Sequence, residues 1–121
     1  MSMEAVHKRL EAWKEAKKLA IEVYQLTKSF PKQETFLLAS QMQRAAVSVP
    51  SNIAEGAARA GKVEFSRYLT VALGSLAELD TQLEISRELN YLSASSFEVS
   101  LKQIDKTRRL ILGLRKSLNQ K

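Results

Sequence analysis

The sequence contains no cysteine and only one histidine, His7. The lack of cysteine excludes disulfide bonds, thiol catalysis and metal sites with cysteine ligands. Acid–base catalysis near neutral pH has few candidate groups, because His7 lies among Lys8 and Arg9 near the start of the sequence. Glu-x-x-His and His-Glu-x-x-His metal motifs, glycine-rich phosphate loops and dinucleotide fingerprints are also missing. We therefore expect a non-enzymatic protein with no catalytic residue, no metal site and no cofactor.

Glycine, proline and long apolar runs are scarce as well. Four glycines and two prolines are too few for the turns of a β-rich fold, whereas 45% hydrophobic and 26% charged residues are typical of globular proteins. Unbroken apolar runs are short, such as residues 110–112, so no segment is long enough to cross a bilayer. A length of 121 residues suits one domain. We expect a single domain over residues 1–121, located in the cytoplasm, with no membrane partner.

Apolar residues recur at helical spacing in four segments, which we place at about residues 5–28, 33–60, 62–89 and from 95 onward. The third segment has the clearest heptad pattern, formed by Phe65, Leu69, Ala72, Leu76, Leu79 and Leu83. Pro31, Gly61 and Asn90 mark the ends of the first three segments, and Ser95 with Glu98 predicts a capping box for the fourth. This pattern predicts an all-α, up-down-up-down antiparallel four-helix bundle.

The net charge of +6 is concentrated at one end of the sequence. Residues 102–121 hold seven of the nineteen basic residues and one of the thirteen acidic ones, so residues 1–101 hold twelve of each. On a helix, Lys102, Lys106, Arg109 and Lys116 fall in a narrow sector opposite the apolar residues. We define the C-terminal basic surface as Lys102, Lys106, Arg108, Arg109, Arg115 and Lys116. It is either an anion-binding face or a solvated face whose charge also complements the helix dipole.

A line of polar residues runs along the second segment and passes Pro50. Its members recur every three or four residues beside the apolar face, and they are Gln41, Arg44, Ser48, Asn52, Glu55 and Arg59. An interior proline removes a backbone hydrogen bond and costs about 3 kcal/mol or more, which favours a break near Val49. The polar line nevertheless keeps its phase on both sides of the proline. We therefore predict one helix, kinked at Pro50.

The third segment carries a matching polar line, made of Arg67, Tyr68, Ser75, Glu78 and Gln82. If the second and third helices pair antiparallel around Gly61, facing residues have numbers that sum to about 122. This register predicts two ion pairs and one hydroxyl contact, namely Arg44 with Glu78, Glu55 with Arg67, and Ser48 with Ser75. The facing arginines would keep both glutamates ionised, which disfavours a catalytic carboxylate pair.

We define the polar seam as Arg44, Ser48, Asn52, Glu55, Arg59, Arg67, Ser75 and Glu78. The small side chains of Gly74 and Ser75 predict a close approach of the two helices there. The seam either fixes the helix register or lines a subunit interface. Alternatively, it is a solvated face with local pairs such as Glu55 with Arg59.

The stretch SVPSNIAEG at residues 48–56 resembles the bacterial four-helix-bundle family known as 23S rRNA intervening-sequence proteins. The likeness includes AWKEAKKLA around Trp13, FPKQE, QMQRAAVSVPSNIAEG and FSRYLTVALGSLAELDTQLEIS, and it covers about residues 8–92. It implies a ring-like homopentamer, and a relation to basic accessory proteins of diversity-generating retroelements, which engage nucleic acid and a reverse transcriptase. The family pattern falls on Arg44, Ser48, Pro50, Asn52, Glu55, Gly56, Gly74, Ser75 and Glu78.

Together these features predict an oligomeric helical-bundle protein that binds RNA or DNA through the C-terminal basic surface. Such binding would depend on the phosphate backbone, since few aromatic residues lie near these cations. The alternative is a structural or protein-interaction adaptor whose basic face only keeps it in solution. A membrane-surface role ranks third, because Phe97 is the one large aromatic residue on the apolar side of the fourth segment.

Overall fold

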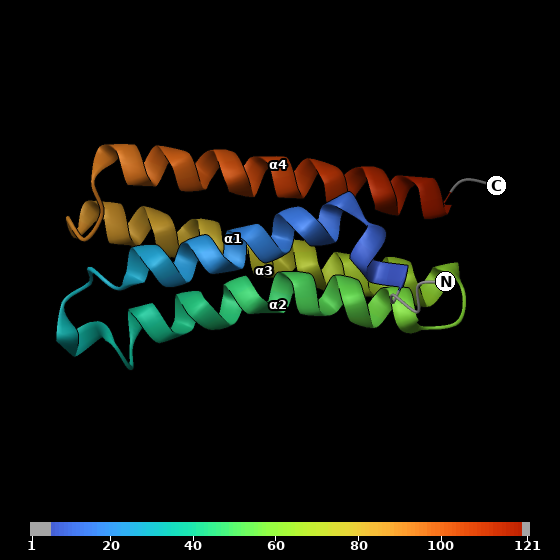
Figure 1. The fold of residues 1–121 in the computed structure, drawn as a ribbon, viewed down its shortest axis with the longest axis horizontal. Coiled ribbons are helices and arrows are strands. Elements are labelled where there is room, and N and C mark those ends of the chain that lie inside the picture. The colour runs from blue at the N-terminus through green and yellow to red at the C-terminus, as the bar shows by residue number, and fades with distance from the viewer. Residues whose placement is uncertain (1–5, 120–121) are drawn as a thin grey trace.

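The computed structural model describes residues 6–119. Four long helices form the fold: α1 (Glu11–Thr27), α2 (Leu38–Ala58), α3 (Lys62–Glu88) and α4 (Ala94–Asn119). Two short 3-10 helices, η1 (Val6–Arg9) and η2 (Lys32–Glu34), precede α1 and α2. Each helix runs antiparallel to the next, and α4 packs back against α1 (Figure 1). The predicted up-down-up-down four-helix bundle is confirmed.

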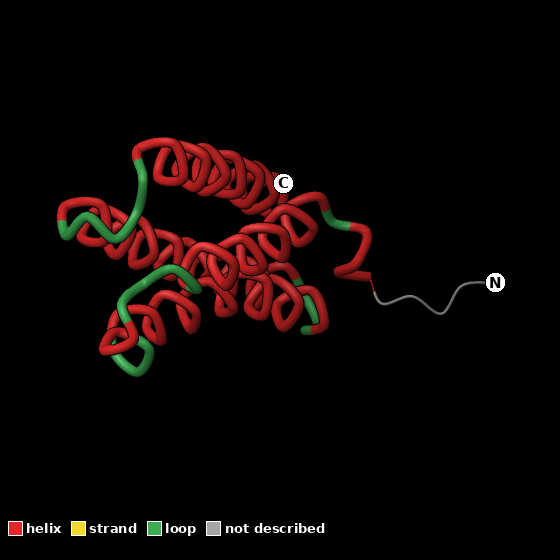
Figure 2. The backbone as a smooth tube through the Cα atoms, turned by 60° about the vertical axis from the view of Figure 1, so that its left-hand side comes forward, coloured by secondary structure: helices red, strands yellow, loops and turns green. Residues whose placement is uncertain are grey.

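Loops and turns join the helices, and no strand occurs between residues 6 and 119 (Figure 2). The start of α1, the α2–α3 turn and the end of α4 lie at one end of the bundle. The α1–α2 and α3–α4 connections lie at the other. Within the part of the chain that the structure describes, no helix is both long and apolar enough to cross a membrane.

The first two helices are shorter than their apolar patterns predict. Leu10 has an extended backbone that separates η1 from α1, and residue 5 lies outside the described residues. The second helix was predicted from residue 33 but begins at Leu38, because the chain first makes the 3-10 turn of η2. The Glu34 carboxylate accepts a hydrogen bond from the Leu38 amide at 3.3 Å and so satisfies one free donor of α2. Apolar Phe36 consequently falls in the connection, where it is 90% exposed.

Asn90 ends the third helix as predicted. Its φ of 62° is left-handed, the Asn90 amide bonds to the Arg87 carbonyl at 3.0 Å, and the Tyr91 amide bonds to the Ser86 carbonyl at 2.9 Å. These two bonds satisfy carbonyl groups that the helix end would otherwise leave free. The predicted capping box at Ser95 is wrong, because Ser93 is the capping residue and its hydroxyl accepts the Ser96 amide at 3.1 Å.

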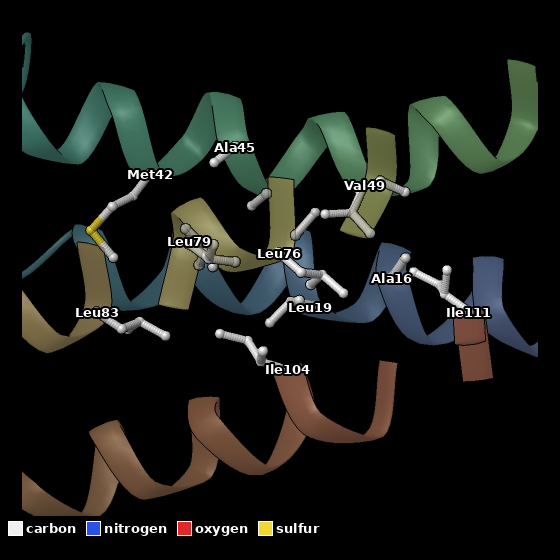
Figure 3. Packing of buried hydrophobic residues seen from close by; sticks show 14 of the residues in the cluster. Ala16, Leu19, Met42, Ala45, Val49, Leu76, Leu79, Leu83, Ile104 and Ile111 are labelled. Carbon is white, nitrogen blue, oxygen red and sulfur yellow. The ribbon is translucent and has the colours of Figure 1, made fainter. Parts of the chain in front are cut away.

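All four helices contribute to one hydrophobic core (Figure 3). The heptad of the third helix is confirmed, since every member except the partly buried Phe65 is buried in this core. Leu76 meets side chains of the other helices at the centre of the bundle, and Leu19 and Ile104 are equally inaccessible to solvent. Helix α2 continues through Pro50 without a break, as predicted. Burial of Val49 and Ile53 on either side of the proline holds the helix together there.

Candidate nucleic-acid interface and polar seam

The centre of the polar seam is a cluster of three half-buried side chains, Ser48, Asn52 and Ser75. The hydroxyl oxygens of Ser48 and Ser75 lie 2.8 Å apart, which confirms the predicted contact between α2 and α3. The Asn52 amide donates to the Ser48 hydroxyl at 2.9 Å and to the Ser48 carbonyl at 2.8 Å. The cluster therefore links the two helices within two residues of Pro50, a contact that agrees with the interpretation of the seam as a register device.

The charged ends of the seam do not form the predicted ion pairs. Glu55 pairs at 2.7 Å with Arg59, which directly follows α2, and Arg67 pairs with Glu64 at 3.7 Å. Arg44 and Glu78 are both exposed, and neither forms an ion pair with another residue between 6 and 119. Long exposed side chains gain little by reaching across to a second helix, because water screens the attraction and holding them costs entropy. The solvated interpretation therefore describes the two ends of the seam.

Arg59 also connects α2 to α3. Its guanidinium donates a hydrogen bond to the Tyr68 hydroxyl at 3.0 Å and lies 5.3 Å from the centre of that ring. The hydrogen bond to Glu55, together with the nearby Tyr68 hydroxyl, raises the pKa of Arg59 above its usual range. Arg59 is therefore a seam residue that contacts α3, although its contact is with Tyr68 rather than with a carboxylate.

The C-terminal basic surface divides into two parts. Four of its side chains, Lys102, Lys106, Arg109 and Lys116, are exposed along α4, whereas Ile104 and Ile111 are buried on its opposite side. Arg108 and Arg115 are half-buried and turn toward α3. Arg108 lies 3.8 Å from Asp80 of α3 and 3.3 Å from Asp105 of its own helix, and Arg115 donates to the Thr70 hydroxyl of α3 at 3.2 Å. Four of the six cations are therefore exposed to solvent along α4, and the other two lie at the interface between α3 and α4.

Carboxylates offset part of the charge on this surface. Lys106 lies 3.4 Å from Glu15 of α1, and Arg109 lies 3.0 Å from Asp105. Lys102 and Lys116 form no ion pair with any carboxylate of residues 6–119. Lys102 and Lys116 are therefore the cations of this surface whose charge is least offset by neighbouring carboxylates.

Glu15 is a half-buried carboxylate between α1 and α4 whose contacts the sequence did not reveal. Only 14% of its side chain is exposed. The Gln103 amide donates to the Glu15 carboxylate at 2.9 Å and to the Glu15 carbonyl at 3.1 Å. That hydrogen bond, and then the charge of Lys106, lower the pKa of Glu15 against the opposing effect of burial. Glu15 and Gln103 are 88 positions apart, so no local pattern could link them.

Glu15→Gln is expected to change how stability depends on pH. A carboxylate whose pKa is lower in the folded state than in the unfolded chain stabilises the fold above its unfolded pKa. That contribution disappears as the pH falls through the lowered folded-state pKa. The difference in unfolding free energy between wild type and Glu15→Gln should therefore be constant near neutral pH and shrink in acid. Urea unfolding across pH measures it, with the exposed Glu98→Gln as control, and parallel wild-type and Glu15→Gln profiles would contradict the prediction.

A hollow of about 350 Å³ lies between α1 and the start of α4. Glu22 is the only titratable residue among those that line it, and its carboxylate accepts a hydrogen bond from Ser100 at 2.9 Å. Acid–base catalysis generally needs a second group of different protonation state, which this hollow does not provide. Residues 6–119 also hold no cluster of three or more His, Asp or Glu side chains that would suit a metal ion.

A family model for the 23S rRNA-intervening sequence protein matches residues 8–113. The chain belongs to this family. The match extends beyond the resemblance seen in the sequence and includes most of α4 of this intervening-sequence protein. No curated protein matches the chain in sequence.

The fold of this intervening-sequence protein is also found in a crystal structure from Bacteroides thetaiotaomicron. That structure is described as a protein of unknown function from the S23 ribosomal protein family. The two chains share 20% identity, and the superposition has a TM-score of 0.80 over 87% of this chain and 95% of the other. At that identity the likeness shows the shared bundle fold.

The structure explains one glycine of the family stretch SVPSNIAEG. A Cβ atom at Gly56 would lie 2.8 Å from the Tyr68 Cβ and 2.9 Å from the Phe65 ring, so α2 and α3 make their close approach here. The close approach predicted at Gly74 and Ser75 is found at Ser75 alone, because Gly74 is exposed and a Cβ atom there would meet nothing within 4 Å. At this end of α2, the packing of the two helices therefore requires a residue without a side chain at position 56.

Proposed function

We propose that this intervening-sequence protein is a non-enzymatic, oligomeric bundle that binds RNA or DNA electrostatically through the C-terminal basic surface. The observation that carries the proposal is the line of four exposed cations on α4, two of which have no carboxylate partner among the described residues. Lysine and arginine on such a face replace counterions along a phosphate backbone, which gives affinity with little sequence specificity. The acidic residues near Lys106 and Arg109 would reduce the contribution of these two cations to phosphate binding.

Binding of labelled RNA and DNA at increasing salt tests this proposal. Affinity should fall steeply, with a log–log slope of about 0.9 per phosphate contacted on duplex DNA. An α4 variant with Lys102, Lys106, Arg109 and Lys116 changed to Gln should bind at least about tenfold more weakly and show a shallower slope, because phosphate contacts are lost. Fluorescence anisotropy measures both quantities, and circular dichroism shows whether helicity is retained.

A matched control variant removes four positive charges elsewhere, at Arg9, Arg44, Lys62 and Arg67. All four are exposed, and they lie outside α4. This control should keep most of the wild-type affinity. No measurable binding at low salt, or an equal loss in both variants, would reject the proposed site.

The second candidate function is a protein-interaction adaptor, favoured by the exposed apolar side chains of the bundle. Phe36 is 90% exposed and Val63 is 76% exposed, while Val71 and Ile85 project from α3. Such side chains are available to a partner protein or to further copies of this chain, for which the family resemblance implies five. An oligomer by light scattering that binds neither RNA nor DNA would favour this second function.

A further inference from the structure

Helix α1 contains three lysines and three glutamates, so its net charge is zero. The fold places most of the negative and the positive charges on different sides of the helix. Glu15 bonds to Gln103, and Glu22 accepts a hydrogen bond from Ser100, so both carboxylates face α4. The lysines remain exposed on the outer side of α1, followed by exposed Lys28 just after its last turn. We define the α1 basic face as Lys14, Lys17, Lys18 and Lys28. Glu11 is the one exposed acid of α1, and it pairs with Lys14 at 3.4 Å.

Aromatic side chains accompany this face, which distinguishes it from the exposed cations of α4. The Lys17 ammonium lies 4.9 Å from the centre of the Trp13 ring, in a cation–π contact. Tyr24 is 46% exposed. It lies two helical turns beyond Lys17 and one turn before Lys28, so all three share one side of α1. Proteins that bind single strands commonly combine lysines that contact the phosphate backbone of the nucleic acid with an exposed aromatic ring on which a base stacks.

A hollow of about 280 Å³ adjoins Tyr24, between the end of α1, η2 and the start of α2. Its lining combines the rings of Tyr24 and Phe30 with Lys28, Lys32 and Gln43. The Gln43 amide nitrogen donates to the Thr27 hydroxyl at 3.0 Å, so the amide oxygen is left to accept from a ligand. An aromatic wall, an amide acceptor and two lysines suit one planar base and its phosphates.

We propose that the α1 basic face binds a single strand of RNA or DNA, with one unstacked base held against Tyr24 in this hollow. A duplex would present its phosphates to the lysines but not the faces of its bases to Tyr24, which favours a single strand. Lys106 of α4 lies 3.4 Å from Glu15 of α1, so the α1 basic face meets the exposed cations of α4 at Glu15. The inference rests on the proposed function for its ligand class and adds a second helix and a strand preference.

The test compares three variants that each lose four positive charges: the α1 variant (Lys14, Lys17, Lys18 and Lys28 to Gln), the α4 variant and the control variant described above. Single-stranded RNA, single-stranded DNA and duplex DNA of equal length are the probes. The α1 variant should lose at least about tenfold in affinity for either single strand, and its salt slope should fall by about 0.7 per lost phosphate contact. A difference between the RNA and DNA arms identifies the preferred strand.

Tyr24→Ala provides the evidence for a base contact. It should weaken single-strand binding about tenfold, which corresponds to about 1.4 kcal/mol for one stacked base. Binding of inorganic polyphosphate, which has no bases, should not change. Trp13 is the only tryptophan, and its emission should change when a single strand draws Lys17 from the ring.

The outcomes separate this inference from the proposed function. Equal single-strand affinity of the α1 and control variants, or equal loss of polyphosphate and single-strand binding in Tyr24→Ala, overturns the α1 site. If the α4 variant alone is defective, the proposed function stands without it. A defective α1 variant with an intact α4 variant supports the α1 site and rejects the α4 site. A wild-type protein that binds none of the probes rejects both.

Discussion

Leu76→Ala is expected to lower the free energy of unfolding by about 2–5 kcal/mol. Leu76 is completely inaccessible to solvent, and its side chain lies among residues of the other helices (Figure 3). Truncation removes buried methyl groups and leaves a cavity that three surrounding helices cannot fill without moving. A small domain has only about 5–15 kcal/mol of total stability, so this one change should remove a large part of it.

Urea unfolding followed by circular dichroism measures the Leu76→Ala effect. Val71→Ala is the matched control, because Val71 lies on the same helix and is 49% exposed. Its effect should stay within about 0.5 kcal/mol. Similar losses in the two variants would mean that the apolar side of α3 does not face the core in solution.

Gly56→Ala is expected to destabilise the protein by about 1–3 kcal/mol, although alanine is the better helix former. The added Cβ would lie 2.8 Å from the Tyr68 Cβ and 3.3 Å from the Phe65 carbonyl oxygen. Backbone atoms of α3 cannot rotate away as the end of a flexible side chain can. The two helices must therefore separate, which loosens the core between them and strains the Arg59–Tyr68 contact.

Gly74→Ala is the control with the opposite expected sign. Gly74 lies within α3, and its added Cβ would meet nothing within 4 Å, so the variant should gain up to about 1 kcal/mol from helix propensity. Thermal or urea unfolding of the two variants compares the signs directly. Stabilisation of both variants would show that α2 and α3 do not approach closely at Gly56.

Local patterns were sufficient for most of the fold. The heptad of α3 places five of its six members in the buried core, and Asn90 ends the helix in the left-handed conformation that asparagine tolerates. The same reasoning failed at residues 33–37, where apolar spacing predicted helix. Glu34 accepts the Leu38 amide and also accepts the Tyr91 hydroxyl at 3.0 Å, so a contact with a distant loop sets the start of α2.

The polar seam shows which contacts residue spacing can predict and which it cannot. Antiparallel register correctly paired Ser48 with Ser75, because short side chains meet only where the backbones bring them together. The same register failed for Arg44 with Glu78, since long charged side chains have many exposed positions and little reason to choose one across the seam. Burial was therefore the missing information, and spacing alone does not supply it.

The sequence by itself determined the all-α class, the four helices, the core side of α3 and the cations along α4, because these depend on periodicity within each segment. The tertiary structure decided which charges remain free. Glu15 and Glu22 face α4 while the lysines of α1 stay on solvent, so a helix that is neutral by its residue count has a basic outer side. The net charge of a helix follows from its sequence, whereas the charge available to a ligand depends on which side chains packing leaves exposed.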